Sequence, residues 1–246
     1  MIPDAVRALE RDLRGIFGSR LQSLAIFGAR ADSHDAQHGH DRHARGAATP
    51  TRTLAVVESM TREDLRAAAT RVEAWHDAGL ATPLLFAARE FSQSLDAFPL
   101  EFGAILADHV VVAGDNPFAS LAIDPADVRR AVEVQARSHL LHLREGFLET
   151  RGRTDALSLL ILQSAPAFAA LVTSIARLDG KPDGDAARAG RHVERLVGQS
   201  EHGAISEVVK LSTAHDLSSA AADQLFAPYL DAMERIVAYV DGWSAR

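Results

Sequence analysis

The sequence contains no cysteine, and this absence excludes several kinds of chemistry. Disulfide bonds, thiol catalysis and cysteine–zinc sites all need a side chain that is missing from the 246 residues. Long apolar runs are missing as well, because none approaches the roughly 20 residues that span a bilayer. The first residues mix acidic and basic side chains and lack the apolar stretch of a secretion signal. We therefore expect a cytoplasmic protein without a membrane partner.

An excess of positive charge is the third absence. Lys and Arg number 26 against 33 Asp and Glu, so the formal net charge is -7 at pH 7. Without a global basic field, nucleic acid is not an expected partner, although a nucleotide pocket could still be locally basic. The 47% of hydrophobic residues is the value of an ordinary soluble protein. The length suffices for one large domain or two small ones.

The first half of the chain has the pattern of an α/β domain built on one sheet. "LQSLAIFGARA" is a short apolar run closed by Gly28, which indicates a buried strand that ends in a tight turn. Residues 31–50 are polar and without a period, so we predict a loop. The remaining predictions are a helix over 4–17, a capped helix in "TREDLRAAATRVEAWHDAGL", a strand leading into a short piece in "TPLLFAAREF", and strands over 53–59, 98–105 and 109–113.

The second half is predicted to be helical throughout. Asp124 as the N-cap and Pro125 at the first helical position start a helix that reaches about Thr150. Further helices are predicted over 154–178, 185–199, 201–214 and 218–243, and no strand signal follows residue 118. We therefore predict an α+β protein, with a mixed sheet and its helices in residues 1–118 and an all-α helical bundle in residues 119–246.

Three segments of the chain occur in the order of a known enzyme family. They are "IFGARA" at 26–31, "TRTLAVV" at 51–57 and "FPLEF" at 98–102. With this order the chain resembles the nucleotidyltransferase superfamily, whose members include kanamycin nucleotidyltransferase and the DNA polymerase β-like proteins. The segments "SLDAFPLEF", "GDNPF" and "LLHLREGFLE" are similar in particular to bacterial predicted nucleotidyltransferases of unassigned substrate. The resemblance covers nearly the whole chain, including a helical bundle after the sheet domain.

The resemblance implies a defined chemistry. Family members move a nucleoside monophosphate from an NTP to a hydroxyl, and two Mg²⁺ ions clamp the attacking and leaving oxygens. One strand ends in Gly-Ser against the phosphates, the next carries Asp-x-Asp on one face, and a later strand brings a third acid. By position, the nucleotide-binding residues would be Gly28, Ala29, Arg30, Thr51 and Thr53, and the third acid, a Mg²⁺ ligand, would be Glu101.

The chain departs from the family at the residues that would hold the metal. Thr51 and Thr53 stand at the two aspartate positions, and threonine is a neutral, poor Mg²⁺ ligand. Ala29 replaces the serine of the phosphate-binding turn. A second alignment puts Asp41 and His43 at i and i+2, but "ARGAATP" follows and no strand can start there, so Asp41 would lack rigid placement. Glu101 alone does not make a two-metal site.

Histidines are concentrated in the predicted loop. Four of the 11, His34, His38, His40 and His43, fall within ten residues. Imidazole suits Zn²⁺, Ni²⁺ or Cu²⁺, so one interpretation is a transition-metal site. The other is a solvated insertion that only resembles such a site, because neither cysteine nor a helical His-x3-His spacing accompanies it.

A basic helix face also has two interpretations. "QARSHLLHLREGFLE" carries Arg137, His139, His142 and Arg144 among leucines. These side chains would either close over a substrate or form the solvated face of a helix whose leucines reach the core.

Two functions of different classes, and as a third a purely structural or homo-oligomeric role, are consistent with these observations. In the first, the protein is a pseudoenzyme that has lost the carboxylate pair and binds an NTP or a protein partner. In the second, it is an active nucleotidyltransferase that adds a nucleotide to a hydroxyl of a small molecule or protein, with Mg²⁺ as its cofactor. The missing carboxylates favour the first function, because the two bridging ions would have no ligands.

Overall fold

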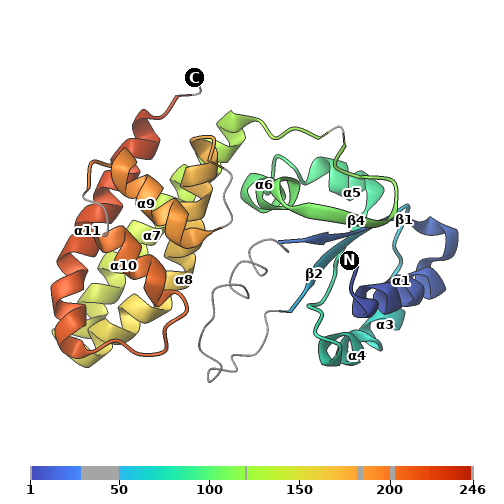
Figure 1. Ribbon diagram of the computed structural model, residues 1–246, viewed down its shortest axis with the longest axis horizontal. Helices are drawn as coiled ribbons and strands as arrows, with labels where there is room; N and C mark the ends of the chain where they lie inside the picture. Colours follow the sequence, from blue (N-terminus) through green and yellow to red (C-terminus); the bar gives the residue numbers. More distant parts are fainter. Residues whose placement is uncertain (1, 29–49, 120, 182–184, 200–202, 245–246) are drawn as a thin grey trace. The chain divides into compact units, whose positions relative to one another are not determined.

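The computed structural model describes residues 2–28, 50–119, 121–181, 185–199 and 203–244 (Figure 1). The chain divides into two compact units, Met1–Ile123 and Asp124–Arg246, which are called unit 1 and unit 2 below. Each unit has its own secondary structure and its own packing.

Unit 1 is built on a four-stranded mixed sheet. Its strands are β1 (Leu21–Phe27), β2 (Arg52–Val57), β3 (Leu84–Ala87) and β4 (His109–Gly114), in the order β3-β2-β1-β4. β1 runs antiparallel to β2 and to β4, whereas β2 and β3 are parallel. β1 and β2 are apolar runs in the sequence because both of their faces are covered. Both predicted strands are confirmed.

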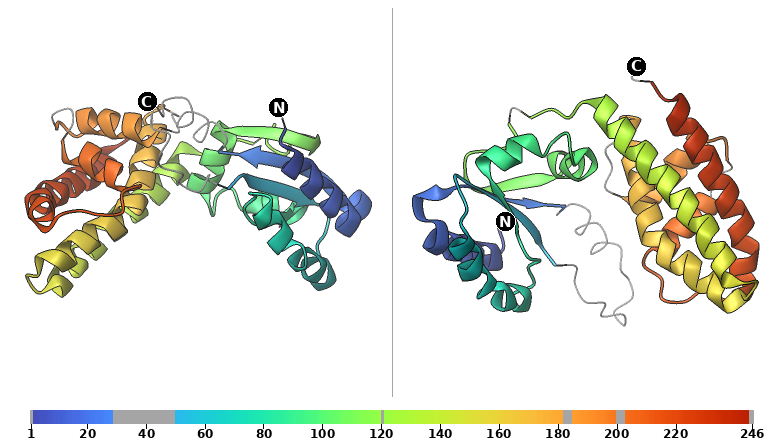
Figure 2. Two further views of the ribbon diagram at one scale, coloured as in Figure 1. Left: turned by 60° about the horizontal axis from the view of Figure 1, so that its bottom comes forward. Right: turned by 180° about the vertical axis from the view of Figure 1, so that it is seen from behind.

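Helices cover both faces of the sheet (Figures 1 and 2). On one face, called the α1 face, lie α1 (Asp4–Phe17), α3 (Arg62–Ala69) and α4 (Val72–Asp77). On the other, called the α6 face, lie α5 (Ala88–Gln93) and α6 (Pro99–Ala107). Side chains of a strand alternate between the two faces, so Leu24 and Ile26 pack toward α1 while Ala25 packs toward α6.

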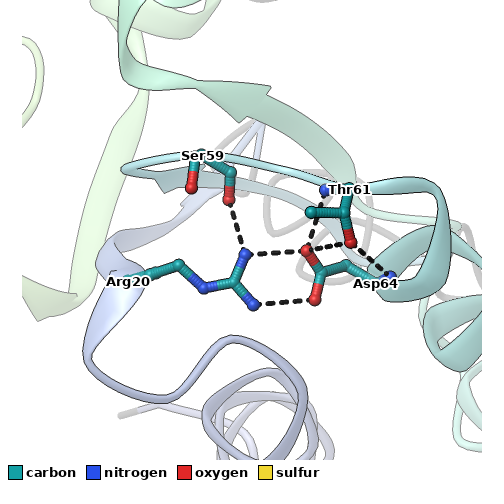
Figure 3. Close-up of polar contacts among 4 residues, drawn as sticks. All are labelled: Arg20, Ser59, Thr61 and Asp64. Atoms are coloured by element: carbon teal, nitrogen blue, oxygen red, sulfur yellow. Dashed lines mark hydrogen bonds and ion pairs between the residues drawn. The ribbon is translucent and has the colours of Figure 1, made fainter.

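An arginine clamp joins the start of β1 to the start of α3 (Figure 3). The two terminal nitrogens of Arg20 donate to the two carboxylate oxygens of Asp64, at 2.7 Å each, and one also donates to the Ser59 carbonyl at 3.1 Å. Thr61 and Asp64 form the predicted capping box, in which each side chain accepts from the other residue's backbone N–H. The Arg20 guanidinium and the Thr61 N–H hold the pKa of Asp64 well below its usual range.

The single helix predicted after Thr61 is two helices. α3 ends at Ala69 and α4 begins at Val72. Between them the Thr70 hydroxyl donates to the Ala67 carbonyl at 2.7 Å, a local side-chain bond of the kind that competes with the helical ladder.

The strand predicted over 98–105 is wrong, because this segment forms helix α6. Pro99 occupies the first helical position, where its fixed φ favours a helix start. Pro99, Phe102 and Ile105 recur every three residues and are all buried, which is a helical period rather than a strand period. The strand predicted over 109–113 is confirmed as β4.

The described residues of unit 2 form a bundle of five helices. They are α7 (Pro125–Thr150), α8 (Thr154–Leu178), α9 (Ala186–Leu196), α10 (Ala204–Leu211) and α11 (Ser219–Gly242). α7 begins as predicted, with the Asp124 side chain accepting from the Ala126 N–H at 2.8 Å. Among the residues that the structure describes, none after β4 lies in a strand. The predicted α+β architecture, a mixed sheet followed by an all-α bundle, is therefore confirmed.

α8 is the central helix of unit 2. It packs against α7, α9, α10 and α11. By length and composition it is also apolar enough to cross a membrane. No long apolar run was predicted here, because Ser, Thr, Gln and Pro interrupt the apolar residues. The core helix of a soluble bundle has the same composition, and many α8 side chains are buried in this way.

Candidate functional site

The predicted phosphate-binding turn lies where β1 ends. Gly28 has a φ of 71°, in the left-handed region that favours glycine, and its N–H donates to the Asp108 carbonyl at 3.0 Å. That N–H is therefore already engaged within the fold. A Cβ at this position would collide with the guanidinium of Arg52. The Arg52 side chain therefore occupies the space that a side chain at position 28 would need.

Arg52 is the middle residue of the Thr-Arg-Thr segment and begins β2. It pairs directly with Phe27, and its guanidinium carbon lies 5.2 Å from the centre of the Phe27 ring. Cation–π contact of this kind holds a guanidinium in place while its N–H edge stays available. Arg52 is exposed, and among the described residues no carboxylate pairs with it. The strand that carries acids in the resembled family thus presents a cation here.

The two threonines do not offer a metal site. Thr53 is 1% exposed and lies on the α1 face of β2 with Ala55 and Val57. Its hydroxyl has no hydrogen-bond partner among the described residues. Thr51 is tied by its backbone, which donates to the Gly79 carbonyl and accepts from the Ala81 N–H, both at 2.9 Å. Neither side chain carries a charge that could hold Mg²⁺.

His109, at the start of β4, is a site residue that the sequence did not reveal. Its Nδ1 lies 3.1 Å from the Ile105 carbonyl and 3.2 Å from the Leu106 carbonyl, both at the end of α6. A carbonyl only accepts, so Nδ1 carries the proton and donates to it. The imidazole also packs against Phe118 with ring centres 4.5 Å apart. No motif links residue 109 to the Gly28 turn, because only strand pairing brings them together.

Sheet pairing places three side chains in one line. Phe27 pairs with Arg52 on β2 and with His109 on β4. Directly paired residues of antiparallel strands project to the same face, and Phe27 packs against the core on the α6 face. We call Arg52, Phe27 and His109 the Arg52–His109 row. It lies at the end of β1 beside Gly28, and it combines a permanent cation, an aromatic ring and an imidazole.

Glu101 does not stand where its predicted role requires. It was predicted on a strand next to the aspartate positions, but it lies in the first turn of α6 and is exposed. Within the described residues, no group of three His, Asp or Glu side chains is placed to hold a metal ion. The strand argument for Glu101 as a third acid therefore fails, and its metal-binding role stays a prediction.

Several predicted site residues lie outside the described residues. These are Ala29, Arg30, Asp41 and the four histidines His34, His38, His40 and His43. The nucleotide-binding and metal-binding roles given to them remain predictions.

The arginines of the basic helix face on α7 are paired with acids. Arg137 donates to Asp241 on α11 at 2.6 Å and to Glu133 at 3.2 Å. Arg144 donates to Glu234 on α11 at 2.7 Å. These ion pairs link α7 to α11, which agrees with the interpretation of a solvated helix face. The leucines were expected to reach the core, but only Leu143 is buried, whereas Leu141 and Leu148 are 63% and 76% exposed.

His139 of the same face reaches into the bundle. Its Nε2 lies 2.6 Å from the Tyr229 hydroxyl, which in turn lies 3.2 Å from the Ser164 hydroxyl. Burial lowers the pKa of His139 to about 4, and the neighbouring His142 lowers it in the same direction. Burial also raises the pKa of Tyr229. The polar chain thus joins α7, α8 and α11 with a neutral imidazole at one end.

Comparison with known proteins bears on the fold. Neither a protein-family model nor a curated protein matches this chain. Among solved structures, it is similar to the spectinomycin adenyltransferase AAD(9) from Enterococcus faecialis, solved with ATP and spectinomycin. The TM-score is 0.53 and the sequence identity 10%, over 97% of this chain and 98% of that one. The chain therefore has a nucleotidyltransferase fold with a helical C-terminal region.

Proposed function

We propose that this protein binds nucleotides without a metal ion and does not catalyse metal-dependent nucleotidyl transfer. The observation that carries the proposal is Arg52, whose guanidinium lies against Gly28 at the end of β1 with no carboxylate partner among the described residues. In the resembled family, this strand end receives the phosphates of an NTP. The two neighbouring positions that would hold Mg²⁺ are Thr51 and Thr53.

A guanidinium is well suited to replace the metal in binding, though not in catalysis. It stays charged at all ordinary pH values and can donate two parallel hydrogen bonds to one phosphate group. It cannot bridge the attacking and leaving oxygens as two Mg²⁺ ions do. A site in which a guanidinium takes the place of the metal ions therefore supports binding of a nucleotide but not its transfer.

The sign of the Mg²⁺ effect follows from the same charges. Mg²⁺ bound to a triphosphate removes part of its negative charge, so the attraction to Arg52 weakens. An intact two-metal site would show the opposite behaviour, because its acids repel a nucleotide until the ions are bound. Nucleotide affinity with and without Mg²⁺ therefore separates a pseudoenzyme from an enzyme.

The second candidate is an active Mg²⁺-dependent nucleotidyltransferase acting on a hydroxyl of a small molecule or protein. The similarity in fold over nearly the whole chain to an adenyltransferase solved with ATP and spectinomycin favours it. In this case Mg²⁺ would be the cofactor, and the exposed carboxylate of Glu101 would be the first ligand to test.

The test is calorimetric titration of ATP, and then of the other NTPs, into the full chain, once with EDTA and once with Mg²⁺. We expect binding in EDTA, a several-fold loss of affinity with Mg²⁺, and at least tenfold weaker binding in Arg52→Gln, because a charge-assisted bond is worth about 1.5–3 kcal/mol. Arg66→Gln is the matched control, since Arg66 is an exposed arginine on α3.

Two results would overturn the proposal. One is ATP binding that needs Mg²⁺, together with Mg²⁺-dependent transfer of labelled AMP that Glu101→Gln abolishes, which would establish the second candidate. The other is no binding of any NTP under either condition. A protein partner would then be the remaining function from the sequence analysis, to be sought with the full chain as bait.

A further inference from the structure

Strand β4 forms one edge of the sheet and lacks the usual protection of an edge strand. In the order β3-β2-β1-β4 it pairs with β1 alone, and none of the described strands lies beyond it (Figures 1 and 2). Natural edge strands are commonly guarded by Lys, by Pro or by other charged residues. The β4 sequence, "HVVVAG", contains neither Lys nor Pro and no acidic residue. The opposite edge differs, because Pro83 directly precedes the four residues of β3.

The register of β4 decides which of its backbone groups face outward. The Gly28 N–H donates to the Asp108 carbonyl at 3.0 Å, and the same register continues as far as Val111. Bonded and non-bonded pairs alternate along an antiparallel ladder. Since Asp108 bonds toward β1, Val110 does so as well. His109 and Val111 therefore direct their N–H and C=O groups away from β1, toward the outer edge.

Between these two outward-facing positions lies an exposed apolar side chain. Val110 pairs with Ile26, so its side chain is on the α1 face of the sheet, and it is 47% exposed. The ladder is regular only up to Val111, because the register shifts at the next pair. The regular part of the edge is thus short and has Val110 near its centre.

We infer that the outer edge of β4 pairs with β4 of a second copy of this chain, antiparallel about a twofold axis at Val110. In this register His109 lies opposite Val111 of the second copy, and Val111 lies opposite its His109. Each of these bonded pairs exchanges both of its N–H···O bonds. Val110 lies opposite Val110 of the second copy in a non-bonded pair, where side chains approach most closely.

Complementarity of charge favours a second copy as the occupant. At each bonded pair, an N–H with its partial positive charge meets a carbonyl with its partial negative charge. Asp108, the charged residue that directly precedes the strand, lies opposite the uncharged Val112 of the second copy. Although the chain has a net charge of -7, this register therefore sets no two like charges directly opposite each other. A surface that is complementary to itself is what a twofold contact requires.

The size of the contact sets the expected affinity. One pair of short strands buries less than the roughly 1,600 Å² of a standard protein interface, so a transient dimer is expected rather than a permanent one. We expect a dissociation constant on the order of 10–100 µM. The inference is independent of the proposed function, because it uses the backbone and Val110 at the edge and no nucleotide.

Sedimentation velocity of the full chain, from about 1 to about 500 µM, tests the dimer. The wild type should change from monomer to dimer over this range. Val110→Lys should weaken the dimer at least tenfold, because it sets two like charges opposite each other at the axis. Val134→Lys is the matched control, since Val134 is a 65% exposed valine on α7, and it should dimerise as the wild type does.

A mixing experiment tests the register. Val110→Glu alone should also be monomeric, for the same reason as Val110→Lys. An equimolar mixture of the two variants should dimerise again, because the opposed side chains then carry opposite charges. Restored association requires that position 110 faces its own counterpart, and it also shows that both variants are folded.

Amide hydrogen exchange, followed by NMR, tests which groups take part. The N–H groups of His109 and Val111 should exchange slowly in concentrated samples and rapidly in dilute ones. The N–H of Val110 is directed toward β1, so it should exchange slowly at both concentrations. This alternation from one residue to the next is specific to strand pairing at the edge.

Three outcomes would overturn the inference. A wild type that is monomeric at every concentration would assign the edge to a different partner. A dimer that Val110→Lys leaves unchanged would place the contact elsewhere on the chain. Slow exchange of the His109 and Val111 N–H groups in the monomer would show that another segment of the same chain covers the edge. None of these outcomes changes the test of ATP binding in EDTA, so the proposed function stands or fails separately.

Discussion

Thr53 carries a hydroxyl that is buried and has no hydrogen-bond partner among the described residues. A buried hydroxyl has given up its hydrogen bonds to water, which costs about 1–3 kcal/mol when no protein group replaces them. By position, the resembled family would place an aspartate here, whereas this chain has a neutral hydroxyl that the surrounding core does not satisfy.

Thr53→Val should therefore stabilise unit 1. The substitution keeps the branched shape and removes the unsatisfied hydroxyl, so we expect the free energy of unfolding to rise by about 1 kcal/mol. Denaturation by urea, followed through Trp75 fluorescence in a Trp243→Phe background, measures it. Thr173→Val, followed through Trp243 in a Trp75→Phe background, is the control, because the Thr173 hydroxyl donates to the Ala169 carbonyl at 2.9 Å. A loss of stability in Thr53→Val would show that the hydroxyl has a partner.

At the scale of elements, local signals explain why most helix starts were predictable. Asp124 and Pro125 begin α7, and Thr61 begins α3, each through a cap made within four residues of chain. α6 was missed because its alternating apolar residues suggested a strand. Which three residues of α6 are buried depends on how the helix packs on the sheet, and a local sequence pattern carries no information about that packing.

The capping box and the arginine clamp make α3 the element to test. Thr61→Ala should destabilise unit 1 by about 1 kcal/mol at pH 7, the usual cost of a lost cap. Asp64→Asn should destabilise it further, because both bonds to Arg20 depend on the carboxylate. Thr70→Ala is the control, since its exposed hydroxyl only bonds back within α3. Equal stabilities of Thr61→Ala and Thr70→Ala would contradict the role of the box.

At the scale of the whole molecule, the two units should respond differently to acid. The folded pKa of His139 is about 4, below its ordinary value of 6.5, so the unfolded chain binds more protons between these values. Unit 2 therefore loses stability as the pH falls from 6.5 to 4, by about 3 kcal/mol. The folded pKa of Asp64 is also lowered, from 3.8, so the clamp in unit 1 is intact above about pH 4 and is lost only below it.

We therefore expect unit 2 to lose stability at higher pH than unit 1. Single-tryptophan variants, Trp243→Phe to follow unit 1 and Trp75→Phe to follow unit 2, measure each urea midpoint from pH 7 to pH 4. His139→Gln should remove most of the pH dependence of unit 2 in this range, whereas His215→Gln, at an exposed position of unit 2, should keep it. A loss of stability in unit 1 at a higher pH than in unit 2 would contradict the assignment of the acid-sensitive step to His139.

The sequence by itself determined the elements and their order. Apolar periods, caps and turn residues are local, so they predicted β1, β2, β4 and every helix of unit 2, and with them the α+β architecture. The resemblance in segment order, also found in the sequence alone, implied that threonines stand at the aspartate positions.

Only the tertiary structure decided which side chains lie together near the two expected aspartate positions. Arg52 and His109 are 57 positions apart in the numbering and meet across β1 through strand pairing, which depends on register rather than on local pattern. The approach of the Arg52 guanidinium to Gly28, and the α6 carbonyls that fix the proton of His109, are likewise contacts between distant segments. A site made of such contacts becomes visible only when the sheet has formed.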